Sequence, residues 1–287
     1  MILMRPRHFF HSFVALSALT TLSAGYASAA IILQDSFTNF SGTSVSLAGS
    51  EPEIGPENST GGAATWVADA TYTRTLDGRL RNNATTNTGR SATIGFGTGH
   101  FANNPGIYTL SADIFFEAGL NGSAVWGLGF SEQQSGSEDQ SMANGGGGGV
   151  YYGKPWVFFR ENGTLAGRNN ASSNNVYNGS SGAFPAGNVY SLKLVLDTSL
   201  PNWVLSVFVN NTQVDLLGDA TMNYTMSPNA ALSAVGFTTT EVNGRGYVDN
   251  ILLDFQAIPE PSSLALTGFG VLGLSFCRRR QGRSLSC

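Results

Sequence analysis

The 287-residue chain has very little cysteine and lysine. Its only two cysteines are Cys277 and Cys287, so the 276 residues before them contain no disulfide. Its only two lysines are Lys154 and Lys193, and the net charge is −4. A protein that binds nucleic acid needs a cationic surface to displace counterions from phosphates. The composition therefore excludes nucleic acid as a partner.

The first 29 residues have the composition of a secretory signal peptide. Arg5 and Arg7 precede an apolar run from Phe13 to Leu22, and Ala27 and Ala29 form an A-x-A cleavage site. The alternative, a buried N-terminal helix, agrees less well with the basic and small-residue flanks. About ten apolar residues are too few to span a bilayer. We expect signal cleavage after Ala29 and export of the remainder of the chain.

The C-terminal end of the chain carries a second targeting signal. An apolar, uncharged run over residues 262–277 is long enough for a helix of about 24 Å, a short span for a hydrocarbon core of about 30 Å. The arginines behind it orient it with the tail in the cytoplasm and the body outside. The flanking residues that define this segment are Pro259, Glu260 and Pro261 before the run, and Arg278, Arg279 and Arg280 after it.

This tail, residues 258–283, resembles the PEP-CTERM sorting signal of Gram-negative bacteria. The resemblance implies recognition and cleavage by an exosortase, a membrane intermediate held by the apolar helix, and delivery to the cell surface or extracellular matrix. A plain tail anchor is the rival interpretation. It explains the helix and the arginines but gives no reason for Pro259 and Pro261, which fix φ and favour an extended, accessible stretch.

The body, residues 30–257, is predicted to be all-β. Tyr108 to Glu117 and Tyr190 to Asp197 alternate apolar and polar residues, which is the period of a half-buried strand. Turn residues separate about ten such segments and indicate two antiparallel sheets packed as a sandwich. The further strands are predicted at Ile31–Phe37, Ala92–Phe96, Ala124–Phe130, Trp156–Arg160, Trp203–Val209, Gln213–Leu217, Leu232–Thr238 and Tyr247–Phe255.

The body also resembles the concanavalin A-like, laminin-G-like jelly roll. The segments that carry the resemblance are the strands from Tyr190 and Trp203 and the closing Tyr247-Val-Asp-Asn-Ile-Leu-Leu-Asp. The resemblance implies that the first and last strands lie close together. A galactose-binding-like jelly roll is the competing fold.

Catalytic motifs are scarce in the body. His100 is its only histidine, which rules out a zinc site built on several histidines, and no G-x-S-x-G surrounds a serine. A glycoside hydrolase needs only two carboxylates at about 5–10 Å. The E-x-D-x-E pattern of concanavalin A-like glucanases is absent, and Asp113 and Glu117 lie about 13 Å apart along one strand. We therefore expect no enzymatic activity, with a glycoside hydrolase as the alternative.

Ligand binding is predicted instead, with polysaccharide as the ligand class. Sugar rings stack on flat aromatic faces, and Tyr151, Tyr152 and Trp156 come after a run of five glycines. Trp126 and Trp203 are assigned to the core. Calcium is the one cofactor considered: Asp35 and Asp249-Asn250 would offer it oxygen ligands if the terminal strands pair.

The charge is divided unevenly along the chain. Residues 30–257 hold 9 Lys+Arg and 18 Asp+Glu, so the body carries −9, and the basic residues of the two ends bring the total to −4. An acidic body disfavours anionic polymers. The sequence predicts an exported surface or matrix protein that binds a neutral polysaccharide or serves a structural role.

Overall fold

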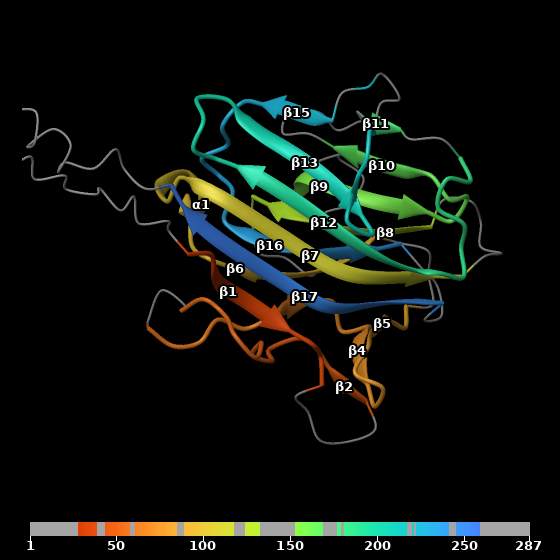
Figure 1. Ribbon diagram of the computed structural model, residues 1–287. Helices are drawn as coiled ribbons and strands as arrows, with labels where there is room; N and C mark the ends of the chain where they lie inside the picture. Colours follow the sequence, from red (N-terminus) through yellow and green to blue (C-terminus); the bar gives the residue numbers. More distant parts are fainter. Residues whose placement is uncertain are drawn as a thin grey trace, which may run out of the picture.

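The computed structural model describes residues 28–38, 44–57, 61–84, 89–117, 124–132, 153–168, 177–178, 181–216, 220, 222–240 and 245–258 (Figure 1). These residues form two antiparallel sheets, and the one helix among them is the four-residue α1 (His100–Asn103). The prediction of an all-β, two-sheet fold is confirmed. The predicted signal helix and C-terminal helix lie outside the described residues.

The larger sheet has ten strands and faces the viewer in Figure 1. Its order is β14-β13-β12-β7-β17-β5-β4-β2, with β1 paired to β17 and β15 paired to β13. The strands are β1 (Ala30–Asp35), β2 (Ser44–Ser46), β4 (Tyr72–Thr75), β5 (Leu80–Asn82), β7 (Gly106–Phe116), β12 (Val189–Asp197), β13 (Trp203–Val209), β14 (Thr212–Gln213), β15 (Asn223–Met226) and β17 (Gly246–Ala257).

The smaller sheet has seven strands and packs behind the first. Its order is β11-β10-β9-β8-β16-β6-β3. The strands are β3 (Val67–Ala68), β6 (Arg90–Gly95), β8 (Val125–Ser131), β9 (Gly153–Arg160), β10 (Leu165–Arg168), β11 (Tyr177–Asn178) and β16 (Ala234–Thr239).

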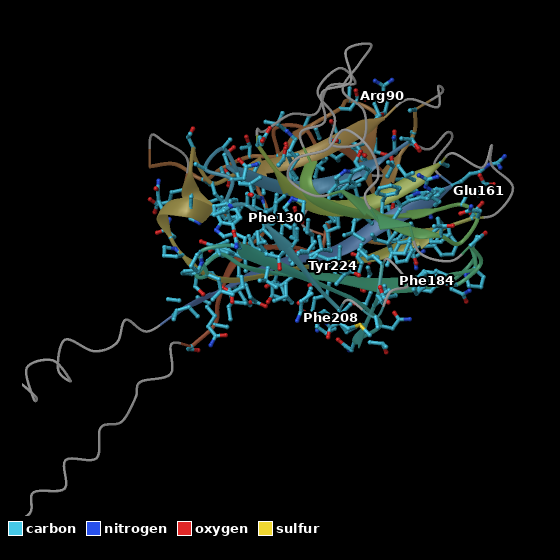
Figure 2. All side chains as sticks on the ribbon, turned by 90° about the horizontal axis from the view of Figure 1, so that it is seen from above. Arg90, Phe130, Glu161, Phe184, Phe208 and Tyr224 are labelled. Atoms are coloured by element: carbon cyan, nitrogen blue, oxygen red, sulfur yellow. The ribbon has the colours of Figure 1, made fainter. Side chains whose placement is uncertain are left out.

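The main core lies between the two sheets. Along β7, buried residues alternate with half-buried ones from end to end, as the sequence predicts. The inward positions, such as Leu110 and Ile114, are fully buried and belong to the same core cluster as Phe130 and Phe237 of the other sheet. Trp126 and Trp203 belong to this core, as predicted. Figure 2 shows Phe130 between the layers, while Phe208 and Arg90 project outside them.

The seven-stranded sheet departs from the expected alternation because β8 and β16 are buried on both faces. A second apolar cluster occupies its outer face and contains Val125, Trp156, Phe158 and Ala166. Trp156 lies across a glycine of the neighbouring strand: a Cβ added at Gly129 would come within 2.4 Å of the Trp156 Cβ. The glycines of β8 are therefore required for this close approach.

The ten-stranded sheet differs from the sequence prediction at β14 and at its other short strands. Instead of Gln213–Leu217, the strand β14 covers only Thr212–Gln213, because the remaining edge of β13, Trp203–Ser206, pairs with β15. The short strands β2, β4, β5 and β15 were not predicted. They are three or four residues long, too short to show a clear period.

The first and last strands of the body lie side by side. Ala30 is opposite Phe255 and Asp35 is opposite Ile251, so β1 begins where β17 ends (Figure 1). On its other side β17 pairs with β7 along nearly its whole length. This arrangement is the one that the jelly-roll resemblance implies.

A buried carboxylate fixes the end of β1 to the core. Asp35 is 1% exposed, and its two oxygens accept hydrogen bonds from the Phe37 N–H at 2.8 Å and the Trp66 indole N–H at 2.7 Å. Burial raises the pKa of Asp35, while these two hydrogen bonds and the Arg74 cation lower it. Phe37 and Trp66 in turn contact Phe237 of β16, so the carboxylate links both sheets.

Replacing this carboxylate is expected to destabilise the body. Asp35→Ala leaves two buried N–H groups without an acceptor, which costs about 2–4 kcal/mol of the free energy of unfolding. Urea denaturation followed by tryptophan fluorescence measures the loss. The control is Asp254→Ala in β17, where the aspartate lies opposite Thr109 on the outer face. Equal stability of the two variants would contradict the role given to Asp35.

Candidate functional site

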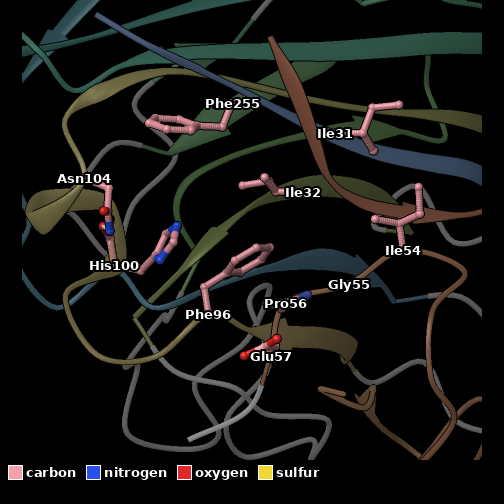
Figure 3. A pocket seen from close by; sticks show the side chains of 10 residues that line it. All are labelled: Ile31, Ile32, Ile54, Gly55, Pro56, Glu57, Phe96, His100, Asn104 and Phe255. Atoms are coloured by element: carbon pink, nitrogen blue, oxygen red, sulfur yellow. Dashed lines mark hydrogen bonds between the residues drawn. The ribbon is translucent and has the colours of Figure 1, made fainter. Parts of the chain in front are cut away.

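A pocket of about 440 Å³ opens where β1 and β17 meet α1 (Figure 3). Four separate parts of the chain line it: the start of β1, the segment after the Gln34–Ile54 bridge, the end of β6 with α1, and the end of β17. The lining residues are Ile31, Ile32, Ile54, Gly55, Pro56, Glu57, Phe96, His100, Asn104 and Phe255.

Backbone pairing positions each of these segments. The second segment is held by two hydrogen bonds between Gln34 and Ile54, with N···O distances of 2.8 and 3.0 Å. The short helix α1 follows Gly99, whose φ of 73° favours glycine, and brings His100 and Asn104 to the same side. The pocket is thus built on hydrogen-bonded backbone rather than on a free loop.

Aromatic rings fix the wall of the pocket. Phe255 stacks on Tyr108 with ring centroids 4.7 Å apart, and Phe96 lies 5.1 Å from His100. Figure 3 shows Ile32, Phe96 and His100 pointing toward the middle of the pocket, with Phe255 on one side and Glu57 on another. Because the rings already contact one another, they are ordered before a ligand binds.

The apolar wall continues onto the surface. Ile31 is 46% exposed and Ile54 is 42% exposed, and both line the pocket. Ile258, the residue after β17, is also among the large exposed apolar side chains. Exposed apolar residues gathered around a hollow are typical of a binding surface.

The polar groups of the pocket are one imidazole, one amide and one carboxylate. Burial lowers the pKa of His100, so its ring is neutral at pH 7 and offers both a donor and an acceptor. The Asn104 side chain donates from Nδ2 to the His100 carbonyl at 2.9 Å. Among the described residues no hydrogen bond reaches Asn104 Oδ1, the His100 ring nitrogens or the Glu57 carboxylate. These groups remain available to a ligand.

Of the three aromatic residues predicted to bind sugar, Tyr151, Tyr152 and Trp156, only Trp156 is among the described residues, and it is buried. Trp156 is 1% exposed and stacks on Phe158, with ring centroids 4.3 Å apart, in the outer cluster of the seven-stranded sheet. Its position opposite Gly129 explains this burial, since a glycine leaves room for the indole against the neighbouring strand. Trp156 therefore offers no open ring face. Tyr151 and Tyr152 lie outside the described residues.

The calcium hypothesis required the terminal strands to pair, and they do. The pairing nevertheless places the two aspartates on opposite faces. Asp35 points into the core, whereas Asp249 lies opposite Asp113 of β7 on the outer face, and Asn250 is the next residue. In the described part of the chain no three His, Cys, Asp or Glu side chains are grouped as for a metal ion.

The Asp113–Asp249 pair was missed in the sequence because it depends on register. Directly opposed residues on antiparallel strands have Cβ atoms about 4.5–5.5 Å apart, much closer than the 13 Å between Asp113 and Glu117. Asn250, at a φ of 51° in an irregular stretch of β17, donates through Nδ2 to Asp113 at 3.0 Å. Neither aspartate lines the pocket.

The environment of this pair changes its acidity. Burial raises the pKa of Asp249 to about 6; the Asn250 N–H, 2.8 Å away, lowers it, and the Asp113 carboxylate raises it. The folded state therefore keeps the Asp249 proton between about pH 4 and 6, where the unfolded chain has lost it. The contribution of this group to stability falls as the pH rises through that window.

Removing the charge of Asp249 is expected to stabilise the body at neutral pH. Asp249→Asn should raise the free energy of unfolding at pH 7.5 by about 1–2 kcal/mol, because solvent screens part of the effect at this half-buried position, and should have a smaller effect at pH 4.5. Urea denaturation at both pH values measures this. Asp254→Asn in the same strand, opposite Thr109, is the matched control. An effect of Asp249→Asn that does not depend on pH would refute the interpretation.

Most of the predicted processing residues lie outside the described part of the chain. They are Ala27 at the signal cleavage site and Pro259, Glu260, Pro261, Arg278, Arg279 and Arg280 in the tail. Ala29 is described and exposed, immediately before β1. Among the described residues no helix is long and apolar enough to cross a membrane.

Comparison with known families identifies the tail. Residues 257–280 match the PEP-CTERM protein-sorting motif, which confirms the sorting signal predicted from the sequence. The match begins at Ala257, the last residue of β17. No curated protein matches the chain.

Several solved structures are similar to the body. The metal-free carbohydrate recognition domain of Emp46p aligns with a TM-score of 0.46 and 9% identity, over 68% of this chain and 89% of that one. Arcelin-5, a lectin-like defense protein from Phaseolus vulgaris, aligns with a TM-score of 0.44 and 8% identity, over 68% of this chain and 93% of that one. Trypanosoma rangeli sialidase aligns with a TM-score of 0.43 and 14% identity, over 75% of this chain and 31% of that one. At TM-scores below 0.5 these likenesses say nothing of what this chain binds.

Proposed function

We propose that this chain is an exported, non-catalytic module that binds neutral polysaccharide at the cell surface or in the extracellular matrix. The observation that carries the proposal is the pocket between β1, α1 and β17. It combines ordered aromatic rings with a neutral imidazole, an amide and one carboxylate. Apolar faces that stack on sugar rings, together with a few polar groups for the hydroxyls, are what a carbohydrate site requires.

The charge of the body supports a neutral ligand. Residues 30–257 carry −9, and the pocket itself contributes Glu57 but no lysine or arginine. An anionic polymer would meet like charge both in the pocket and over the body. A neutral glycan avoids this repulsion and uses the apolar wall.

The route to the surface depends on the two ends of the chain. In this proposal the signal peptide of residues 1–29 directs export, and the body of residues 30–257 folds outside. The sorting signal of residues 258–283 holds it in the inner membrane of a Gram-negative bacterium through a helix over residues 262–277. An exosortase then cleaves near Pro259, Glu260 and Pro261 and releases the body.

Glycoside hydrolysis is the second candidate. Asp113 and Asp249 face each other, and the pKa of Asp249 is raised to about 6, as suits a general acid. The pair lies on the outer face of the sheet and not in the pocket, which favours binding. Release of reducing sugar by the wild type, lost in Asp113→Asn and Asp249→Asn, would establish the enzyme instead. A purely structural role would show neither hydrolysis nor binding.

Truncating the aromatic wall is expected to weaken glycan binding. Phe255→Ala should reduce affinity for neutral polysaccharide roughly tenfold, about 1.4 kcal/mol, because a ring face is lost. Affinity electrophoresis of residues 30–257 through gels containing neutral glucans, mannans or galactans measures it. Phe208→Ala is the control, since Phe208 projects from the outer face (Figure 2). Equal retention of both variants would place the site elsewhere, and no retention of the wild type would favour the structural role.

The sorting proposal has a separate test. Replacing Pro259, Glu260 and Pro261 by alanine in the native host is expected to abolish processing, because the extended, accessible stretch is lost. Immunoblots of membrane and medium fractions should then show an uncleaved, membrane-retained form. Normal release of the triple variant would refute the proposed role of the exosortase.

A further inference from the structure

The pocket lies at the end of the body where the chain leaves for the sorting motif. Phe255 lines the pocket and is two residues from the end of β17 at Ala257, where the motif match begins. Ile31, which also lines the pocket, is the second residue of β1. The paired terminal strands therefore put the pocket and Ala257, from which the chain leads to the sorting motif, at the same end of the sandwich (Figures 1 and 3).

The tether, meaning the segment from Ala257 to Ser262 that joins the body to the apolar run, is short compared with the body. From Ala257 to Ser262, the first residue of the apolar run, the chain takes five steps and reaches at most about 18 Å. Two of the four intervening residues are prolines, which restrict it further. A domain the size of residues 30–257 has a radius of gyration of about 17 Å and hence a diameter near 45 Å. The anchored body therefore lacks the reach to turn over and present this end to the outside.

We infer that the anchored protein holds its glycan pocket against the membrane and that cleavage at the sorting signal opens the pocket to long polysaccharides. This rests on the proposed function. A polymer that approaches a pocket within about 25 Å of a surface loses chain configurations, whereas a short oligosaccharide loses almost none. Processing thus controls when the protein joins a polysaccharide network, and the intermediate stays free of polymer until release.

The experiment compares anchored and released forms with ligands of two lengths. The anchored form without the signal peptide, residues 30–287 in lipid nanodiscs, and the body of residues 30–257 are each titrated with a neutral glucan, a mannan and a galactan. Each glycan is used as its hexasaccharide and as a long soluble polymer. The hexasaccharide should bind both forms with the same dissociation constant. The polymer should bind the anchored form at least about tenfold more weakly.

A linker separates this geometry from other effects of the anchor. About forty Gly/Ser residues inserted between Ile258 and Pro259 add an r.m.s. reach of about 35 Å and should restore polymer binding. The same linker inserted before Ala30 leaves the tether short and should not restore polymer binding.

Two outcomes distinguish failure of the membrane-facing pocket from failure of the proposed function. Equal polymer affinity of anchored and released forms, with the hexasaccharide bound by both, overturns the membrane-facing pocket but leaves the proposed function standing. No hexasaccharide binding by either form overturns the proposed function, and the inference with it.

Discussion

The pairing of β1 with β17 is the constraint on which the rest of the structure depends. The two strands come from opposite ends of the body, and β17 also pairs with β7, so this seam joins the N-terminal strand to the centre of the ten-stranded sheet. The buried Asp35 fixes the seam to Trp66 at one end, and the stacked rings of Phe255 and Tyr108 fix it at the other. Since residues of both strands line the pocket, it exists only when the body is closed.

The two sheets are joined by polar contacts as well as by apolar packing. Tyr72 of β4 accepts the Thr239 N–H at 3.1 Å and donates to the Arg90 carbonyl at 3.0 Å, and Asn82 donates to the Thr239 hydroxyl at 2.7 Å. All of these groups lie in or next to the core, where an unpaired partner would be costly. They set the position of the short strands β4 and β5 against the other sheet, which apolar contacts alone, being non-directional, would leave less defined.

The sequence predicts the long strands well because one face of each is buried. In β7, β12 and β13 every second residue is apolar, and a strand has no other way to bury that set. The same argument fails for Trp156: a strand buried on both faces gives an aromatic residue no signal of which side is open. Asp113 and Asp249, 136 positions apart, could be paired only by knowing the register of β7 and β17. The pocket was missed for a similar reason, since its walls come from four distant segments and no local motif marks them.

The tail contrasts with the pocket, because its signal is local. Three consecutive residues, an apolar run and an arginine cluster are read in order along the chain, and the motif match confirms them without any tertiary structure. What the structure adds is that no spacer separates this address from the folded body: β17 ends at Ala257, where the match begins. Had a long flexible linker intervened, the orientation of the body would be independent of the tail. Because it does not, the strand that completes the fold also determines which face of the sandwich lies toward the tail.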